Sequence, residues 1–189
     1  MRKIILASTS PRRKDILEKL RIPFSIEDSG YKEDMGLKLK PRELARHLAL
    51  GKAKAVAKRH KNTIVIGADT IVVAKNRVLG KPRDASHAME MLKFLSGSVH
   101  KVITGFAIID TKNNKRVSKA VETKVYFRKL TEREIQDYVD SGEAHGKAGA
   151  YAIQVLAGVF VRKVEGDYLN IVGLPLAAVL ESLKKLGVL

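Results

Sequence analysis

Residues 63–74 read TIVIGADTIVVA, a run rich in β-branched side chains that predicts a long buried strand. Lys75-Asn76 follows as a turn and leads to a second short strand at Arg77–Leu79. Asp69 is the only ionisable residue in the run, and an unpaired carboxylate inside a buried strand costs several kcal/mol. Gly67, on the same face of the strand, leaves room for a ligand or another backbone. We therefore expect Asp69 to meet a partner, a metal or a substrate; the alternatives are a structural lysine or a strand break that it caps.

On both sides of this strand the sequence mixes strand and helix patterns. Further strands are expected at Ile4–Ala7, Lys101–Asp110, Lys115–Arg128, Tyr151–Leu156 and Val159–Val164. Helices are expected at Arg12–Leu20, at Pro41 to about His60, from the cap Asp84 to Leu95, from Thr131 to near Gly142, and at Pro175–Leu186. The fold class expected is α/β, with a mixed and largely hairpin-built sheet and flanking helices, in a single domain over residues 1–189.

The composition is that of a globular protein without disulfides. With 189 residues, 45% of them hydrophobic and 30% charged, the chain suits one domain, or one domain with two lobes. No apolar run approaches the roughly 20 residues of a membrane helix, and the apolar start is too short for a secretory signal. We therefore expect a cytoplasmic protein without a membrane partner. Cysteine is absent and the five histidines show no HExxH-like spacing, so a magnesium-type ion held by carboxylates and phosphates is the metal that fits.

The formal net charge is +16, from 36 Lys and Arg against 20 Asp and Glu. Such an excess favours a polyanionic partner, or else it marks a lysine-rich solvated surface of the kind found in thermophiles. The basic residues are spread along the whole chain, aromatic residues make up only 5%, and tryptophan is absent, which disfavours platforms for stacking bases. We therefore interpret the bulk charge as surface and regard nucleic acid as a disfavoured partner.

Residues 7–13, ASTSPRR, end one strand and begin a helix, with Ser10 as N-cap and Pro11 at the first helical position. The free backbone N–H groups of a helix N-terminus form an anion site. Arg12 and Arg13 lie in the first turn, where the helix dipole disfavours cations, and arginine suits phosphate oxygens. The stretch indicates a phosphate site; the alternative is an ordinary capped helix with solvated arginines.

Two lysines and one loop acid are further candidates. Lys52 lies in the apolar stripe of its helix, so it either extends to solvent or points into a site. Lys81 is held in the rigid turn Gly80-Lys81-Pro82, just after the hairpin of Asp69, although a plain surface turn fits as well. Glu33 lies in a polar loop, and by local pattern alone it is only an acidic loop residue.

Two segments rich in small or turn-forming residues complete the candidates. Residues 147–154 would allow close approach of a ligand to the backbone, and residues 166–175 form a second tight segment before a helix; turn chemistry explains both equally well. His100 is either a ligand or a hydrogen-bonded structural residue. The GxxxxGK[ST], GxGxxG and GxSxG motifs are absent, so the chain is not a P-loop enzyme.

Taken together, these segments resemble the Maf (septum formation inhibitor) family of nucleotide pyrophosphatases over nearly the whole chain, in order. The matching segments are Ala7–Arg13, Glu33, Lys52-Ala53, Gly67–Thr70, Gly80–Pro82, Ser96-Gly97 with His100, Thr104-Gly105, Lys147–Tyr151 with Ile153-Gln154, Gly166–Tyr168 with Asn170, and Gly173–Pro175. The resemblance implies a fold like that of the inosine-triphosphate pyrophosphatases, with two lobes around a cleft. It also implies hydrolysis between the α- and β-phosphates of a nucleoside triphosphate, dependent on Mg²⁺ or Mn²⁺.

By this resemblance Asp69 corresponds to the catalytic acid/base. The catalytic set would be Asp69, Glu33, Lys52 and Lys81, with Asp69 and Glu33 also holding the metal. The substrate would be bound by Ser8, Arg12, Arg13, Thr70, Lys147 and Gln154. Among these, Arg12, Thr70 and Gln154 mark the branch that prefers dTTP and UTP. The alternative specificity is that of a sister branch resembling 7-methyl-GTP pyrophosphatases, or another purine triphosphate.

The chain departs from the family pattern next to Lys147. Gly146 stands where the family commonly has Asp, with Glu143 and Asp167 as candidates to replace it, and Ala144 and Ala152 replace a usual Pro and Gly. Two other functions compete with the enzyme: a non-enzymatic regulator of cell division with a protein partner, and a nucleic-acid binder. The full set of acids and lysines argues against a lost activity. A homodimer is a further expectation.

Overall fold

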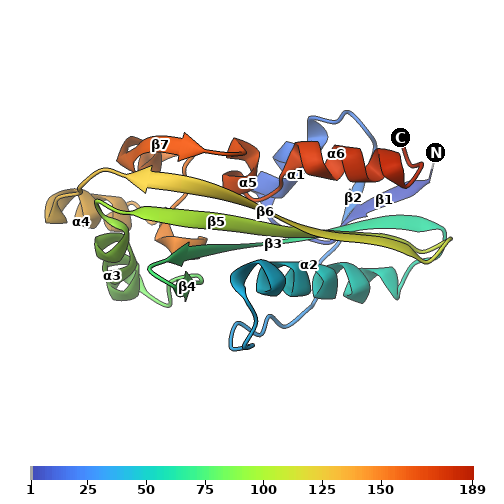
Figure 1. Ribbon diagram of the computed structural model, residues 1–189, viewed down its shortest axis with the longest axis horizontal. Coiled ribbons are helices and arrows are strands. Elements are labelled where there is room, and N and C mark those ends of the chain that lie inside the picture. Colours follow the sequence, from blue (N-terminus) through green and yellow to red (C-terminus); the bar gives the residue numbers. More distant parts are fainter. Residues whose placement is uncertain (1) are drawn as a thin grey trace. The chain divides into compact units, whose positions relative to one another are not determined.

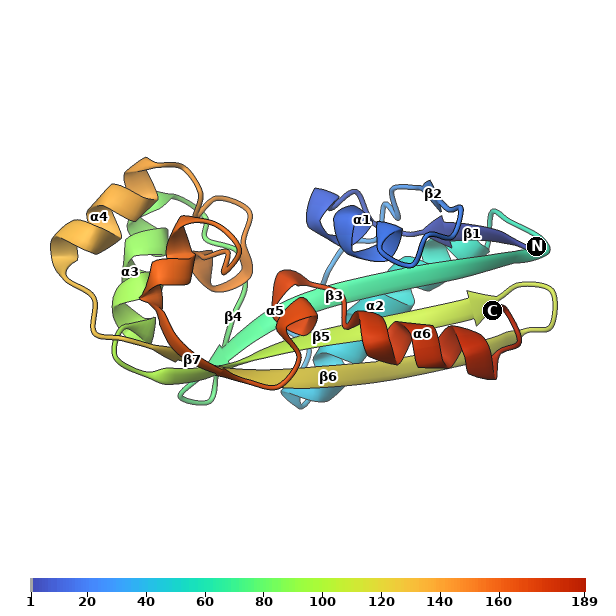
Figure 2. The ribbon, with the colours of Figure 1, turned by 90° about the horizontal axis from the view of Figure 1, so that it is seen from above.

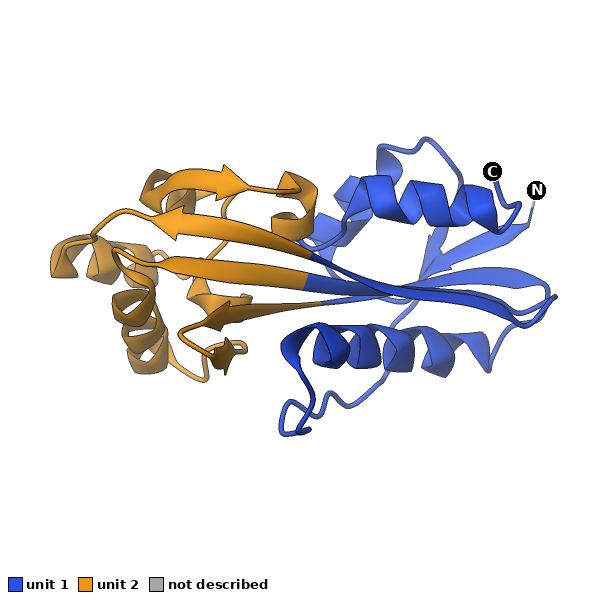
Figure 3. Cartoon of the chain, in the orientation of Figure 1, with its two compact units in different colours: residues 1–69, 104–121, 173–189 blue, residues 70–103, 122–172 orange. Residues whose placement is uncertain are grey.

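A computed structural model describes residues 2–189, which form two compact units. Of the described residues, unit 1 comprises 2–69, 104–121 and 173–189, and unit 2 comprises 70–103 and 122–172 (Figure 3). Three long strands, β3 (Thr63–Ala74), β5 (Val99–Asp110) and β6 (Lys115–Phe127), continue from one unit into the other. The other strands are β1 (Lys3–Leu6), β2 (Ser25–Ile26), β4 (Arg77–Leu79) and β7 (Val161–Glu165), and the strand order is β2-β1-β3-β5-β6-β7, with β4 paired to β3.

Unit 1 is a mixed sheet covered by helices on both faces. Strands β1 (Lys3–Leu6) and β2 (Ser25–Ile26) are parallel to each other, and β1 is parallel to β3. Helix α2 (Pro41–Ala57) covers one face of the sheet, while α1 (Pro11–Glu18) and α6 (Leu176–Lys185) lie on the other (Figures 1 and 2). A buried apolar cluster joins α2 to the sheet: Ile5, Ala7, Ala53, Val56, Val65 and Ala107.

Close packing of α2 on β3 depends on a missing side chain. A Cβ atom at Gly67 would lie 2.5 Å from the carbonyl oxygen of Ala49 and 2.7 Å from the nitrogen of Ala53, so only glycine fits there. The buried face of α2 repeats every three or four residues, as expected for an amphipathic helix. Lys52 is the one charged residue on that buried face of the helix. The packing that brings α2 onto β3 therefore also brings Lys52 to the strand that carries Asp69.

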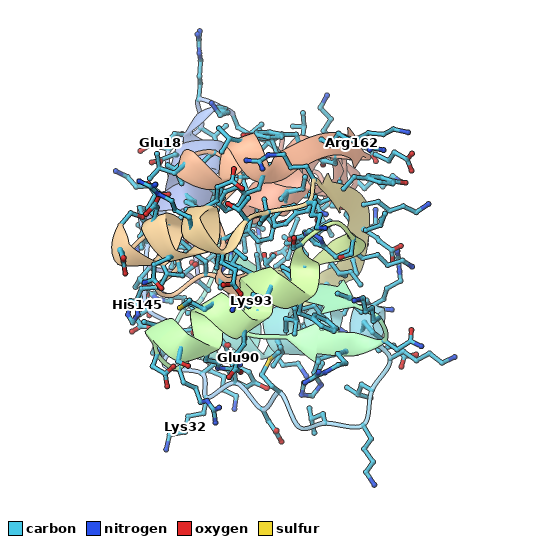
Figure 4. All side chains as sticks on the ribbon, turned by 90° about the vertical axis from the view of Figure 1, so that its left-hand side faces the viewer. Glu18, Lys32, Glu90, Lys93, His145 and Arg162 are labelled. Carbon is cyan, nitrogen blue, oxygen red and sulfur yellow. The ribbon has the colours of Figure 1, made fainter. Side chains whose placement is uncertain are left out.

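Unit 2 contains short helices and two further strands, β4 and β7, beside the ends of the long strands. Its remaining elements are β4 (Arg77–Leu79), α3 (Ala85–Leu95), α4 (Glu132–Asp140), the 3₁₀ helices η1 (Ala148–Ala150) and η2 (Leu156–Phe160), β7 (Val161–Glu165) and α5 (Tyr168–Val172). Strand β4 is antiparallel to β3, and β7 is antiparallel to β6. Helices α3 and α4 pack together, and Lys93 of α3 (Figure 4) forms an ion pair with Glu132 of α4 at 3.0 Å.

Helix caps predicted from local chemistry are largely confirmed. The Asp84 carboxylate accepts a hydrogen bond from the amide of His87 at 2.8 Å, and Thr131 and Glu134 form the expected capping box. Ser10 does occupy the N-cap position of α1, but its side chain makes no capping hydrogen bond. Instead, the Ser10 amide donates to Oγ of Ser8 at 3.3 Å.

The mixed α/β class is confirmed, whereas the strand predicted at Tyr151–Leu156 is wrong. There the chain forms an irregular turn that leads into η2, and β7 begins at Val161 rather than at Val159. Tyr151, Ala152 and Ile153 are buried by irregular packing, whereas Val155 and Leu156 are exposed, and strand propensity alone cannot distinguish such a segment from a strand. The two-residue strand β2 and the short helix α5 were not predicted, and α1 and α2 end two to three residues earlier than expected.

The single-domain boundary over residues 1–189 stays a prediction. Among the described residues, none of the helices combines the length and the apolar character that crossing a bilayer requires.

Candidate active site

The centre of the site is a buried ion pair between α2 and β3. The Nζ atom of Lys52 lies 2.5 Å from Oδ1 of Asp69, and the two residues are 8% and 5% exposed. Both side chains are therefore largely removed from solvent, and each supplies the opposite charge that the other needs. Removing one partner of such a pair leaves an uncompensated buried charge. The sequence expectation that Asp69 meets a partner is confirmed, and Lys52 points inward rather than out to solvent.

Glu33 completes a three-residue cluster. Its Oε1 atom lies 2.6 Å from the same Nζ of Lys52, so the ammonium group bridges two carboxylates. The side chain of Glu33 is 29% exposed, in contrast to the buried Asp69. The cluster thus has one carboxylate in the protein interior and one open to solvent, with a single cation between them.

Arg13 and Ser8 bring the first turn of α1 to this cluster. The Nη1 atom of Arg13 donates to Oγ of Ser8 at 3.2 Å, and its Nε donates to the carbonyl oxygen of Gly173 at 2.9 Å. The positive charge of Arg13 also acts on the carboxylates of Asp69 and Glu33. The guanidinium is therefore held in place by Ser8 and Gly173, within electrostatic reach of both acids, and its part in a phosphate site stays a prediction.

Burial raises the pKa of Asp69 above its ordinary value, because the charged carboxylate loses hydration. The positive charges of Lys52 and Arg13 offset part of this effect, and the negative charge of Glu33 adds to it. Burial likewise lowers the pKa of Arg13. A carboxylate with a raised pKa is a stronger proton acceptor than an ordinary aspartate, which suits it to general-base chemistry.

In unit 2 the segments of Lys81 and Lys147 lie side by side. The amide of Gly149 donates to the carbonyl oxygen of Gly80 at 2.9 Å, which joins the turn before Lys81 to the loop after Lys147. A Cβ atom at Gly149 would lie 3.0 Å from a methyl group of Val72 on β3, so this loop also packs on that strand. The backbones of the two segments therefore meet in unit 2, and the loop after Lys147 packs on β3.

The sequence matches the Maf-like proteins over residues 3–186. The chain belongs to the Maf-like protein family. It is 50% identical over 177 residues to the dTTP/UTP pyrophosphatase of Alkaliphilus oremlandii, covering 93% of this chain and 92% of that one. It is 49% identical over 185 residues to the dTTP/UTP pyrophosphatase of Bacillus mycoides, covering 98% and 96%. The resemblance inferred from the motifs is confirmed.

Among solved structures, the Ham1 protein of Staphylococcus aureus is similar to this Maf-like chain with a TM-score of 0.46 and 13% sequence identity, covering 66% of this chain and 71% of that one. A similarity of this degree carries no inference about activity.

A divalent cation would find two oxygen ligands in this Maf-like site. Asp69 and Glu33 both turn a carboxylate toward Lys52, and the described residues contain no group of three or more His, Asp or Glu side chains that could hold a metal by themselves. Mg²⁺ is commonly bound through one or two carboxylates, with substrate phosphates and waters supplying the other ligands. The donor set therefore fits a hard cation that arrives with its substrate.

The structure gives the positions of the remaining predicted residues in their own elements. Arg12 lies in the first turn of α1 and is half-buried, next to Arg13. Thr70 follows Asp69 on β3, and Gln154 is exposed in the turn before η2. Their participation in one substrate site with Asp69, like that of Lys81 and Lys147, stays a prediction.

His100 is a structural residue here. It is 1% exposed, its Nε2 lies 2.8 Å from the hydroxyl of Tyr151, and its ring meets Phe127 and Tyr151 edge-on. Burial lowers the pKa of His100 to about 4, so it is neutral at pH 7.

Gly146, the departure from the family pattern, lies in an open turn. Its φ is +69°, and a Cβ atom added at this position would have no other atom within 4 Å. The positive φ favours glycine, so the residue found here suits the backbone that the turn adopts.

Sequence reasoning missed two residues that meet beside Glu33 and Lys52, namely Tyr31 and Gly51. The signal was present in the helix: a glycine in the interior of α2, where alanine is the better helix former.

Proposed function

We propose that this chain is a nucleoside triphosphate pyrophosphatase that hydrolyses dTTP and UTP to the monophosphate and pyrophosphate. The observation that carries the proposal is the Lys52 ammonium group held between the buried Asp69 and the more exposed Glu33. The names of relatives at about half identity support the choice of reaction and substrate.

In the proposed reaction Asp69 acts as the general base. It accepts a proton from a water molecule as the water oxygen forms a bond to the α-phosphorus. The bond between the α-phosphorus and its bridging oxygen breaks, and the electron pair leaves with pyrophosphate. Lys52 keeps Asp69 ionised in its buried position, and the raised pKa makes the carboxylate a better acceptor.

The basic side chains bind and orient the triphosphate. Arg12, Arg13, Lys52 and Lys81 would neutralise phosphate oxygens, with Ser8 and Lys147 as further donors. Such groups act by positioning and by electrostatic stabilisation of charge that develops on the leaving group. Arg13 is held in advance by Ser8 and Gly173, so little ordering remains to be done when substrate binds.

Glu33 and Asp69 would hold Mg²⁺ or Mn²⁺ together with phosphate oxygens, and the bound cation supplies charge neutralisation for the leaving pyrophosphate. The base would be read by Thr70 and Gln154, because a side-chain amide offers both a donor and an acceptor to a pyrimidine edge. Homodimerisation and a cell-division partner stay predictions from the sequence.

The experiment is a screen for pyrophosphate release from dTTP, UTP, the purine triphosphates and 7-methyl-GTP, each with Mg²⁺ and with Mn²⁺. We expect release from dTTP and UTP above all others. Faster release from a purine or methylated guanosine triphosphate would contradict the specificity and leave the reaction class standing. An absence of release from every triphosphate, with either metal and at several temperatures, would contradict the enzyme itself.

A further inference from the structure

Glu33 lies in a segment without helix or strand, so the backbone of a regular element does not hold it on Lys52. The segment runs from the end of β2 at Ile26 to the start of α2 at Pro41 and passes beside α2 (Figure 1). Fixing a glutamate side chain costs rotamer entropy, and ordering the loop backbone adds to this cost. An ion pair with a partly exposed partner offsets only a small part of it. Contacts made by neighbouring residues of the segment therefore help to keep Glu33 in place.

One such contact is made by Tyr31, two residues before Glu33. Its ring lies on α2 at Gly51, the residue directly before Lys52. A Cβ atom at position 51 would lie 2.3 Å from Cζ and 2.5 Å from Cε2 of Tyr31, so the ring occupies the space that any side chain there would need. Two neighbouring contacts therefore join the segment to the helix: Tyr31 on Gly51, and Glu33 on Lys52.

The sequence of helix α2 gives independent support for this contact. Gly51 lies in the interior of the 17-residue helix α2. Glycine in such a position is less favourable for the helix than alanine. Alanine stands two residues before and two residues after it, at Ala49 and Ala53. The approach of Tyr31 explains why position 51 alone in this stretch lacks a side chain.

Polar contacts hold the tyrosine and the segment before it. The Tyr31 hydroxyl lies 3.4 Å from Nε2 of His47, one helical turn before Gly51, and the Tyr31 amide donates to Oγ of Ser29 at 3.3 Å. Nearer β2, Arg59 donates to the carbonyl oxygen of Asp28 at 2.7 Å. The segment is thus fixed at one side of Glu33 by the helix that carries Lys52.

We propose that Tyr31, seated on Gly51, is a positioning residue that holds the Glu33 carboxylate on Lys52 for catalysis. The inference rests on the proposed pyrophosphatase function and deepens it. Tyr31 acts through Glu33 and touches no reacting atom. Its loss therefore lowers turnover only while Glu33 is present to be positioned.

A double-mutant cycle tests this dependence. We expect Tyr31→Ala to lower kcat by about 10- to 100-fold, the range that misplacement of a group by about 1 Å can produce, with a smaller change in KM. In a Glu33→Gln background the same substitution should lower kcat by less than about twofold, because coupled residues give non-additive effects. Tyr31→Phe keeps the ring and should retain most activity. Lys32→Ala, an exposed neighbour labelled in Figure 4, is the matched control and should leave kcat unchanged.

Gly51→Ala tests the contact from the helix side. Alanine favours the helix, so a loss of helix stability is not the expected cause of any defect. The new methyl group displaces the Tyr31 ring, and kcat should fall about as far as in Tyr31→Ala. Gly36→Ala, in the same loop and away from the ring, is the control, since a Cβ there meets only the end of the Asp34 side chain at 3.3 Å.

Hydrogen–deuterium exchange separates this proposal from the proposed function. In Gly51→Ala the peptide covering residues 29–36 should exchange about tenfold faster or more than in the wild-type chain, whether or not the chain hydrolyses any triphosphate. Unchanged exchange in Gly51→Ala would overturn the anchor. In an active enzyme, equal losses of kcat for Tyr31→Ala with and without Glu33 would also overturn it, because Tyr31 would then act by another route.

Discussion

At the scale of single residues, the site is organised by one cation shared between two acids. Lys52 has the buried Asp69 on one side and the more exposed Glu33 on the other. A buried ion pair of this kind is weak evidence for stability, since its desolvation offsets much of its attraction. Its location on the face of α2 that packs on β3 instead indicates a function, because a pair of apolar side chains at positions 52 and 69 would pack there without that penalty.

A substitution of Lys52 tests directly whether its ammonium group neutralises the buried Asp69. Lys52→Ala leaves Asp69 buried without its main cation, and we expect the free energy of unfolding to fall by about 3–5 kcal/mol at neutral pH. The measurement is chemical denaturation followed by circular dichroism. Lys54→Ala, at an exposed position of the same helix, is the control and should change stability by less than about 0.5 kcal/mol. Equal stabilities of the two variants would show that the pair is not buried in solution.

At the scale of elements, the sequence predicts what local chemistry determines. Strand β3, the capped start of α3 and the capping box of α4 each have a signal within a few residues, and each is found. Strand β2 and the 151–156 segment depend on partners distant in sequence, which a local pattern cannot contain. The site shows the same difference between local and distant signals. Asp69 and Lys52 stand out in the sequence as charges in apolar patterns. The position of Glu33 instead depends on the contact of Tyr31 with Gly51, which no local pattern contains.

The buried His100, near the start of β5, should make stability depend on pH. The pKa of His100 is lowered by burial to about 4 in the folded chain, from the ordinary histidine value of 6.5 that applies in the unfolded chain. Between these values the folded state binds fewer protons, so stability is lost as the pH falls from 6.5 toward 4, by roughly 3 kcal/mol from this residue. His100→Leu should reduce this pH dependence when unfolding is measured across that range. His145→Gln, at an exposed position labelled in Figure 4, should leave it unchanged, and an unaltered slope in His100→Leu would contradict the assignment.

At the scale of the whole molecule, only some of the basic residues that give the net charge of +16 belong to the candidate site. A pocket in unit 1 of about 580 Å³ is lined by Arg2, Lys3, Lys61 and Lys112, together with Asn62, Thr63, Gly187 and Val188. Lys3 pairs with Thr63 in the register of β1 and β3. Thr63 is six residues before Asp69 on β3, so at about 3.3 Å per residue the two positions are about 20 Å apart along the strand. Among the residues that the structure describes, no aromatic side chain lines this pocket, so it offers charge without a surface for base stacking.

Binding to duplex DNA should therefore be weak and electrostatic. We expect fluorescence anisotropy to detect association at about 50 mM salt that is lost by about 200 mM, as counterion release predicts. The double substitution of Lys61→Ala and Lys112→Ala should weaken the association with DNA below that of the wild-type chain. Submicromolar binding at the higher salt would instead support the nucleic-acid function that the scattered charge disfavours.

The central claim is that Asp69 is the general base of a pyrophosphatase, and a pH profile of turnover with Asp69→Asn beside the wild-type chain tests it most directly. Because the pKa of Asp69 is raised by burial, the acid limb of kcat/KM for dTTP should lie above the ordinary aspartate pKa of about 3.9, with activity falling as the pH drops through it. Asp69→Asn should lose about 100-fold or more of kcat while remaining folded. Asp137→Asn, on the exposed surface of α4, should match the wild-type chain. Turnover retained in Asp69→Asn, with an unchanged acid limb, would contradict the account.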